Sequence, residues 1–396
     1  MKEEFLNNRY RYSKKNINTE YADTLTETEK ILLIINDPNN IQYMTNPSID
    51  LQFVAILESA RCMYSSSPIK YIKDPCPEVQ LAAAKYNEDF LKYIDKPDLV
   101  IQLAAVGSFG VAIKYIKDPS LEVKLASVTY RGSSIEYIDD PTDEMKLIAV
   151  KQDSDAIEYI KDPSLEIQLI AVTKYGRSIR YIKHPSDEVQ LAAVKQDSYA
   201  LDYIQDPCLE AQMAAVQKDG WAIGYIKDPC LEVQLAAITK EENGYSNCIL
   251  GYIKHPFPES QALAVEENGM NIKYITQPSV ELQLTAVKQN EHSIRYIKDP
   301  TPEVQLTAVT KNSAMIKHIK EPSIELQKLA ITRSIKNILY IKHMSADIIK
   351  FTIELINSTT KYNTTLIQTV EKLIDDKVIS ITDVSDGIKL LLELNT

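Results

Sequence analysis

The sequence predicts an all-α solenoid of about 14 two-helix repeats, with a cap at each end. The first observation is a fixed period, because ten of the twelve steps between the prolines that open the units are 22 residues long. Self-similarity at a constant period of roughly 20 to 50 residues is typical of solenoids. The opening prolines are Pro47, Pro75, Pro97, Pro119, Pro141, Pro163, Pro185, Pro207, Pro229, Pro256, Pro278, Pro300 and Pro322.

The second observation is that the repeated segment favours helices over strands. Segments such as Leu165–Leu169 alternate apolar and polar residues, which also fits a strand and a leucine-rich-repeat horseshoe. However, the segment continues into good helix formers such as Ala-Ala-Val-Lys-Gln at 192–196. A proline, a serine and then a glutamate in the first turn form a helix start. We therefore predict a pair of helices in each unit.

Each unit is described here by positions counted from its proline as position 0. The first helix is predicted over positions 1 to 12, and a shorter second helix over positions 14 to 20 that ends before the next proline. Extra segments around 65–68 and 241–247 fall between the two helices of a unit. A loop can lengthen there at little entropic cost.

Three regions follow from this pattern. Residues 1–46 are expected to form an N-terminal cap with a degenerate repeat around Ile31–Asp37. Residues 47–356 form the helical repeat array, in which a last degenerate unit begins at Met344. Residues 357–396 are expected to be a helical C-terminal cap, with apolar helical spacing at 366–374 and 387–394. Caps with a polar outer side are what a solenoid requires.

The first helix carries a recurring glutamine at position 5. On a helical projection, apolar positions 2, 6 and 9 form one cluster and positions 4 and 8 another, and position 5 lies between them. We therefore expect the glutamines to be substantially buried and hydrogen-bonded to backbone or to the next glutamine. A polar row that recognises a ligand is the alternative. The glutamines are Gln52, Gln80, Gln102, Gln168, Gln190, Gln212, Gln234, Gln261, Gln283, Gln305 and Gln327.

Tyrosine recurs at position 18, beside an apolar position 19. We predict a core row with the hydroxyl groups at its edge. The alternative is a platform on which the bases of a single-stranded nucleic acid stack, but no basic groove accompanies the tyrosines. The row is Tyr71, Tyr93, Tyr115, Tyr137, Tyr159, Tyr181, Tyr203, Tyr225, Tyr252, Tyr274, Tyr296, His318 and Tyr340.

The candidate partner-binding residues lie where the repeat varies on an exposed face, because repeat proteins usually bind there. Position 14 is the most variable, and it holds the only tryptophan, Trp221, one unit after Tyr199. Aromatic residues beside small ones at a helix end resemble an interface hot spot. The alternative is that both rings cover helix ends. The full candidate set is Trp221, Tyr199, Gly224, Tyr245, Gly251, Arg177, Arg180, Met270 and His292.

Composition and motifs restrict the function further. A net charge of −11 disfavours general phosphate binding, which needs a basic surface. The five cysteines show no CxxC spacing, and no Gly-rich phosphate loop, HExxH or GxSxG motif occurs. We therefore expect no enzymatic activity, no cofactor and no metal site. The absence of a signal-peptide core and of a long apolar run predicts a cytoplasmic protein, in the host cytoplasm if the chain is viral.

The array resembles known families of short helical repeats. Units reading AVKQD-S-x-AIxYIKDPSxEVQLAAV are similar to short-period HEAT-like repeats, above all to a repeat family of bacteria and large viruses with units like AVKQNG. They resemble the leucine-rich-repeat variant more loosely. The resemblance covers about 47–356 and implies a right-handed α-solenoid used for binding. Position 5 lacks the arginine common in HEAT-like units, which argues against carrying over DNA binding.

Two functions remain open from the sequence. The first hypothesis is a non-enzymatic solenoid that binds one or more proteins as a scaffold or an inhibitor, for example a phage-encoded binder of a host defence protein. The second is a nucleic-acid-binding HEAT-like solenoid. Binding that weakens steeply with salt would favour the second.

Overall fold

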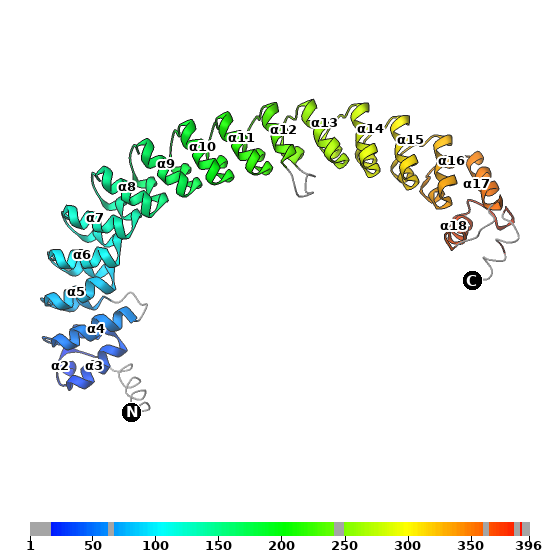
Figure 1. Cartoon of the computed structure of the whole chain (residues 1–396). Coiled ribbons are helices and arrows are strands. Elements are labelled where there is room, and N and C mark those ends of the chain that lie inside the picture. Colours follow the sequence, from blue (N-terminus) through cyan, green and yellow to red (C-terminus); the bar gives the residue numbers. More distant parts are fainter. Residues whose placement is uncertain (1–16, 62–66, 241–248, 359–363, 384–388, 390–396) are drawn as a thin grey trace. The chain divides into compact units, whose positions relative to one another are not determined.

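The chain is helical throughout the part that its computed structural model describes, residues 17–61, 67–240, 249–358, 364–383 and 389, and no β-strand occurs in those ranges (Figure 1). By internal contacts it divides into two compact units, 1–211 and 212–396. These two large parts are called the N-terminal unit and the C-terminal unit below. Both alternate α-helices with short 3-10 helices, labelled α and η. The all-α solenoid predicted from the sequence is confirmed.

The N-terminal unit begins with α2 (Thr19–Asp23) and continues in pairs of one α-helix and one 3-10 helix. The pairs are α3 (Glu27–Asn36) and η1 (Pro38–Tyr43), α4 (Ile49–Arg61) and η2 (Pro68–Tyr71), α5 (Pro77–Tyr86) and η3 (Glu88–Tyr93), α6 (Leu99–Ser108) and η4 (Gly110–Tyr115), α7 (Leu121–Tyr130) and η5 (Gly132–Tyr137), α8 (Asp143–Gln152) and η6 (Ser154–Tyr159), α9 (Leu165–Lys174) and η7 (Gly176–Tyr181), and α10 (Asp187–Gln196) and η8 (Ser198–Tyr203).

The boundary between the units falls within α11 (Leu209–Lys218), which pairs with η9 (Gly220–Tyr225). The later pairs are α12 (Leu231–Thr239) and η10 (Ile249–Tyr252), α13 (Pro258–Glu267) and η11 (Gly269–Tyr274), α14 (Val280–Gln289) and η12 (Glu291–Tyr296), α15 (Pro302–Lys311) and η13 (Ser313–His318), and α16 (Ile324–Arg333) and η14 (Ile335–Tyr340). The last elements are α17 (Ala346–Ser358), α18 (Thr364–Asp375) and η15 (Ile381–Asp383).

Most repeats are a ten-residue α-helix over positions 2 to 11 followed by a six-residue 3-10 helix over positions 13 to 18, whereas α4 has 13 residues, α12 has 9, and η2 and η10 have 4 each. The unit opened by Pro163 illustrates why. Ser164 caps α9 by accepting a hydrogen bond from the backbone N–H of Ile167. The extended residue at position 12 ends the α-helix, and where it is Asp or Asn its side chain caps the 3-10 helix, as Asp153 does for η6. The second helix is therefore 3-10 rather than the α-helix suggested by the sequence.

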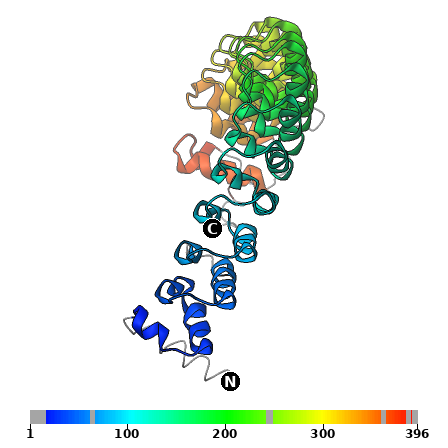
Figure 2. The same ribbon diagram turned by 90° about the vertical axis from the view of Figure 1, so that its left-hand side faces the viewer.

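Successive α-helices contact one another, and so do successive 3-10 helices, as α5 with α6 and η3 with η4 in the N-terminal unit and α13 with α14 and η11 with η12 in the C-terminal unit. The two kinds of helix therefore form two rows within each unit. Figure 2 shows the two rows side by side near the N-terminus. The interior between the rows holds the apolar side chains.

The core is formed by positions 4, 8 and 9 of the α-helix and positions 16 and 19 of the second half. In the unit opened by Pro163, Ile167, Ala171, Val172, Ile179 and Ile182 are all buried. Position 2 departs from the prediction that it clusters with positions 6 and 9, because its side chains are exposed: Leu121 is 59% exposed and Leu165 48%. Position 2 is the first residue of the α-helix, so its side chain lies beyond the end of the packed row.

The glutamines at position 5 hydrogen-bond to backbone, as predicted, and four of them are buried. The partner lies in the same unit, since Nε2 donates to the carbonyl oxygen of the opening proline at 2.7–3.1 Å. This bond occurs in Gln52, Gln80, Gln102, Gln168, Gln190, Gln234, Gln261, Gln283, Gln305 and Gln327. Each glutamine thus fixes the corner at which its α-helix begins.

A second set of hydrogen bonds joins neighbouring repeats. In them, the side chain at position 11 of one repeat bonds to backbone of the repeat before it, for example to the N–H at position 13. Gln152 Oε1 accepts from the N–H of Gly132 at 2.7 Å, while its Nε2 donates to the carbonyl of Tyr130 at 3.2 Å. Where position 11 is lysine, as in Lys174, its ammonium donates to the last carbonyls of the preceding α-helix. These contacts satisfy backbone groups that a helix end leaves without intrahelical partners.

At both ends of the chain, the repeat pattern extends beyond the segments that an opening proline marks. Residues 26–43, assigned to the N-terminal cap as a degenerate repeat, form the pair α3 and η1 with the usual geometry. At the other end α17 begins the unit predicted at Met344, and α18 packs on η14. The helix predicted at 366–374 is therefore confirmed, whereas the one predicted at 387–394 lies almost wholly outside the described residues.

The close approach at position 13 yields a stability prediction. A Cβ atom added to Gly176 would lie 2.5 Å from the carbonyl oxygen of Ala193, whereas Gly107, in the exposed side of α6, has open space around it. We expect Gly176→Ala to lower the free energy of unfolding by about 1–3 kcal/mol, and Gly107→Ala to raise it by up to about 1 kcal/mol. Urea denaturation measures both. Equal effects of the two substitutions would contradict the close approach.

Candidate functional site

The row of 3-10 helices carries an exposed edge of tyrosines. Nine position-18 tyrosines are 37–57% exposed, namely Tyr71, Tyr93, Tyr137, Tyr159, Tyr203, Tyr225, Tyr252, Tyr296 and Tyr340. The prediction of a core row is therefore wrong. Positions 15 and 16 of the 3-10 helix and the extended residue at position 19 are buried, as Ser178, Ile179 and Ile182 are. Position 18 is the last residue of the 3-10 helix, and its ring lies at the border of this buried face.

Cations cover many of these tyrosines. In six units a Lys or Arg at position 17 lies over the ring of its own neighbour at 4.6–5.1 Å from the ring centroid. The pairs are Lys70 and Tyr71, Lys92 and Tyr93, Lys114 and Tyr115, Arg180 and Tyr181, Lys273 and Tyr274, and Arg295 and Tyr296. The edge thus carries both aromatic and charged groups within reach of solvent, where cation–π contacts contribute about 0.5–1 kcal/mol each.

Position 17 changes its chemistry along the edge while position 18 stays aromatic. In the N-terminal unit it is a cation at Lys114 but a carboxylate at Glu136, Glu158 and Asp202. In the C-terminal unit it is first glycine, at 224 and 251, then a cation at Lys273, Arg295 and Lys317, and finally Leu339. The scaffold therefore presents one constant row of rings beside a variable row of charges.

The two glycines make room for an aromatic cluster of Trp221, Tyr252 and Tyr274. The Trp221 and Tyr252 rings meet edge to face, with centroids 5.2 Å apart and planes at 80°. A Cβ added at Gly224 would lie 3.4 Å from Tyr252 Cδ1, and one at Gly251 would lie 2.8 Å from Tyr274 Cε1. The space that the glycines leave is thus taken by tyrosine rings of the following repeat.

The cluster combines fixed backbone with exposed rings. Asp219 accepts a hydrogen bond from the N–H of Trp221 at 3.0 Å, which holds the start of η9. Trp221 is 36% exposed and Tyr252, at 57%, is the most exposed tyrosine of the edge among the described residues. Tyr225, next to Gly224, is 40% exposed. In the C-terminal unit, aromatic surface with glycine at position 17 therefore precedes the repeats in which position 17 is a cation.

In the N-terminal unit, the predicted residues Arg177, Arg180 and Tyr199 join neighbouring repeats. Arg177 Nε donates to Asp197 at 2.7 Å, and its guanidinium lies 5.7 Å from the Tyr199 ring centroid. Arg180 Nη2 donates to Asp155 at 2.7 Å. The hydrogen bond that Arg177 donates to Asp197 is the main reason that the pKa of Arg177 lies above its usual value. These cations thus already have partners between repeats.

Position 14 has a similar role elsewhere in this unit. The Tyr115 hydroxyl donates to Asp89 at 2.5 Å, and this bond holds the pKa of Asp89 below its usual value. Asp89 and Asp155 both bond to residues of the following repeat. Variation at position 14 therefore reflects inter-repeat contacts as well as exposure.

The remaining predicted residues are scattered. Met270 is half-buried and His292 is exposed, and the N–H of each donates to an asparagine cap at position 12. His292 Nε2 lies 4.0 Å from Glu291 Oε1. Neither residue is part of the Trp221 cluster as its contacts define it. Tyr245 lies outside the described residues.

Sequence reasoning missed Tyr225, Tyr252 and Tyr274, which line the cluster with Trp221. The signal that could have found them is the neighbour at position 17: glycine at 224 and 251 replaces the long side chain that otherwise covers the tyrosine ring. The strict repetition of tyrosine concealed this difference, because it suggested a purely structural role.

Within the described ranges, no group of three His, Cys, Asp or Glu side chains is placed to hold a metal ion. No described helix has the length and apolar character needed to cross a membrane. Comparisons with protein families, with curated proteins and with solved structures find no match to this chain. The candidate site consequently rests on the geometry of the 3-10 edge itself.

The exposure of Trp221 leads to a prediction about stability. We expect Trp221→Ala to lower the free energy of unfolding by about 0.5–1.5 kcal/mol, the magnitude of one edge-to-face aromatic pair. Phe90 in η3 is fully buried, so Phe90→Ala should cost about 3–5 kcal/mol. Denaturant unfolding compares the two variants. Equal losses would make Trp221 a core residue and would remove it from the candidate site.

Proposed function

We propose that this chain is a non-enzymatic, protein-binding solenoid whose partner docks on the 3-10 edge, with the Trp221–Tyr252 cluster as the anchor. The observation that carries the proposal is the exposed aromatic stretch of Trp221, Tyr225 and Tyr252 in the C-terminal unit, where position 17 is glycine, followed by the repeats in which position 17 is a cation. Tryptophan and tyrosine are enriched among the residues that dominate binding energy at protein interfaces. Charged groups around such an anchor favour specificity and correct register.

A partner that binds here removes the exposed rings from water. Tyrosine and tryptophan present large rigid surfaces with little side-chain entropy to lose on binding. At Lys273 and Arg295 the ring beside each cation is already covered, whereas position 17 supplies no side chain beyond hydrogen at 224 and 251. A partner can therefore bury the Tyr252 ring without first displacing a cation at position 17 of the same repeat.

Nucleic-acid binding is the second candidate, and the exposed tyrosines with neighbouring cations favour it. Bases could stack on such rings while cations contact phosphates. Glu136, Glu158 and Asp202 oppose it, because they place carboxylates in the same row and would repel a continuous phosphate backbone. A gel-shift series with a single-stranded oligonucleotide at increasing salt tests this candidate, and steeply salt-dependent binding would favour it.

A site-specific crosslinking experiment tests the protein-binding proposal. A photoreactive phenylalanine analogue replaces Tyr252 in one variant and Tyr137, at the same repeat position beside Glu136, in a matched control. We expect the analogue at 252 to capture a protein from cells of the source and the analogue at 137 to capture much less. Equal capture at both positions, or none at 252, would contradict an anchor at the cluster.

The captured protein, once purified, allows a quantitative test. We expect Trp221→Ala to weaken its binding by about 2 kcal/mol, roughly thirtyfold. Gly224→Lys should weaken binding as well, because it adds a charged side chain beside the Tyr252 ring, whose Cδ1 would lie 3.4 Å from the new Cβ. Calorimetric titration gives the affinities, and melting curves establish that the variants remain folded. Unchanged affinity in both folded variants would exclude the cluster as the anchor.

A further inference from the structure

Two pockets of the 3-10 edge are built from the same repeat positions. Each is lined by positions 17 to 21 of one unit, its following proline and glutamine, and positions 18 to 21 of the next unit. The first, of about 370 Å³, lies between η13 and η14, and the second, of about 890 Å³, lies between η6 and η7. The pocket is therefore a property of the repeat, and its chemistry is set by the residues that vary.

The charges of the two pockets differ. The pocket at η13 and η14 is lined by Lys317, Lys320 and Lys342 with Glu321 as its one carboxylate. The pocket at η6 and η7 is lined by two lysines, Lys161 and Lys183, and by two carboxylates, Glu158 and Asp162. A histidine at position 21 of the later repeat lines each pocket, His343 in the first and His184 in the second. The first is thus positive and the second balanced, and the sign at position 17 makes the difference.

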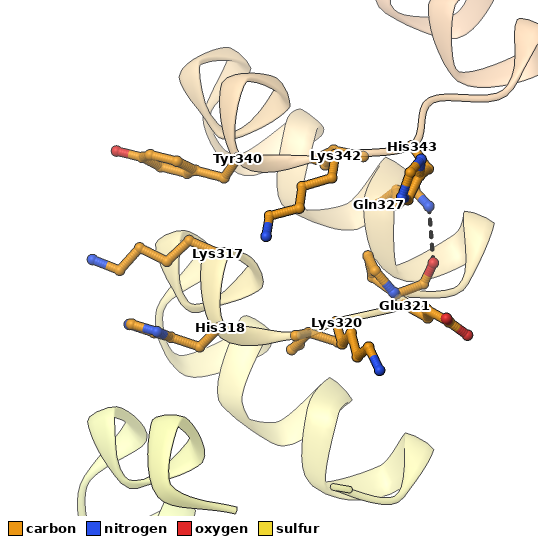
Figure 3. Close-up of a pocket in the computed structure, with 11 residues that line it drawn as sticks. Lys317, His318, Lys320, Glu321, Gln327, Tyr340, Lys342 and His343 are labelled. Carbon is orange, nitrogen blue, oxygen red and sulfur yellow. Dashed lines mark hydrogen bonds between the residues drawn. The ribbon is translucent and has the colours of Figure 1, made fainter. Parts of the chain in front are cut away.

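The arrangement of the positive pocket fits an anion (Figure 3). Lys342 extends from its loop into the space between the two repeats, while the Glu321 carboxylate points away from that space. The Gln327 amide nitrogen closes the inner end but already donates to the Pro322 carbonyl at 2.8 Å. The donors left for a ligand are therefore the lysine ammonium groups, on a floor that includes Ile319 and Ile341.

His318 gives separate evidence for the positive field at this pocket. Its pKa lies below the usual value, first because of burial and then because of the nearby charges of Lys317, Arg295 and His292. The imidazole is consequently neutral near pH 7, where it can donate or accept a hydrogen bond beside the lysines. The overall charge of −11 does not describe this part of the edge.

We propose that the pocket formed by Lys317, Lys320, Lys342 and His318 binds a phosphate group, either as a free phosphate compound or as a phosphorylated side chain. Three lysines and one carboxylate line the pocket, and this excess of positive charge suits a doubly charged phosphate, which offers several strong acceptor oxygens. This inference does not depend on the proposed function, because the aromatic cluster and the pocket consist of different residues.

Titration with inorganic phosphate at constant ionic strength, with chloride as the balancing anion, tests the pocket directly. We expect saturable binding by calorimetry and phosphorus NMR, and an upward shift of the His318 pKa in proton NMR when phosphate is present. Lys317→Glu gives this pocket the charge pattern of its counterpart and should weaken binding at least about tenfold. Lys114→Glu is the matched control, the same substitution at the same position of another repeat, and should leave binding unchanged.

The balanced pocket allows a gain-of-function test. In the Lys317→Glu background, Glu158→Lys should restore phosphate binding, now at η6 and η7, because it creates the three-to-one pattern of charges there. Competition between inorganic phosphate and a phosphoserine peptide would show that the pocket accepts a phosphorylated protein. Binding of inorganic phosphate alone would assign it to small phosphate compounds.

Three outcomes would overturn the proposal. The first is the absence of saturable phosphate binding to the intact protein. The second is equal weakening by Lys317→Glu and Lys114→Glu, which would indicate a diffuse charge effect. The third is binding of a single-stranded oligonucleotide that inorganic phosphate does not displace, because this would point to contacts along the whole edge rather than to a pocket.

Discussion

The stability of this protein depends on contacts between neighbouring repeats. A ten-residue α-helix and a six-residue 3-10 helix are too short to persist alone in water. Position 8 is alanine or another small residue in most units, and it lets the following or preceding repeat approach closely, as the carbonyl of Ala193 approaches Gly176. Bonds such as those from Gln152 to the preceding repeat then satisfy exposed helix ends. Cohesion is thus local, and it leaves the outer face of the 3-10 row free to vary.

Much of the architecture could be predicted from the sequence because the opening proline and the helix-capping residues recur along the array. Ser164 and Gln168 behave as expected, the first as an N-cap and the second as a partly buried partner of the backbone. The type of the second helix could not be predicted as easily. Isoleucines at positions 16 and 19 fit both helix types over so short a segment. The tyrosines were placed in the core because they recur strictly beside the apolar position 19. The same repetition affected the candidate site, because Trp221 stood out as unique whereas Tyr252 was part of a repeated pattern.

The 3-10 edge separates the parts of the repeat that maintain structure from those that can diversify. The ring at position 18 stays nearly constant, and the isoleucines beneath it remain buried. Position 17 meanwhile changes from Lys114 to Glu158 to Gly224 without altering the helices around it. A change of charge among the exposed side chains at this position costs little folding energy, whereas Gly251 is confined by the Tyr274 ring, whose Cε1 would lie 2.8 Å from an added Cβ. A single position can therefore give each repeat a distinct recognition surface.

The bonds between positions 11 and 13 also bear on how such a chain could change its length. Gly132, Gly176 and Gly269 each pair with a glutamine of the following repeat. Excising one whole unit, such as residues 141–162, would keep every proline in phase but would place Gly132 beside Lys174 in place of Gln152. When a repeat is duplicated or lost, positions 11 and 13 must still match at the new junction. Pairs of adjacent repeats with matching residues are therefore the segments that can be gained or lost together.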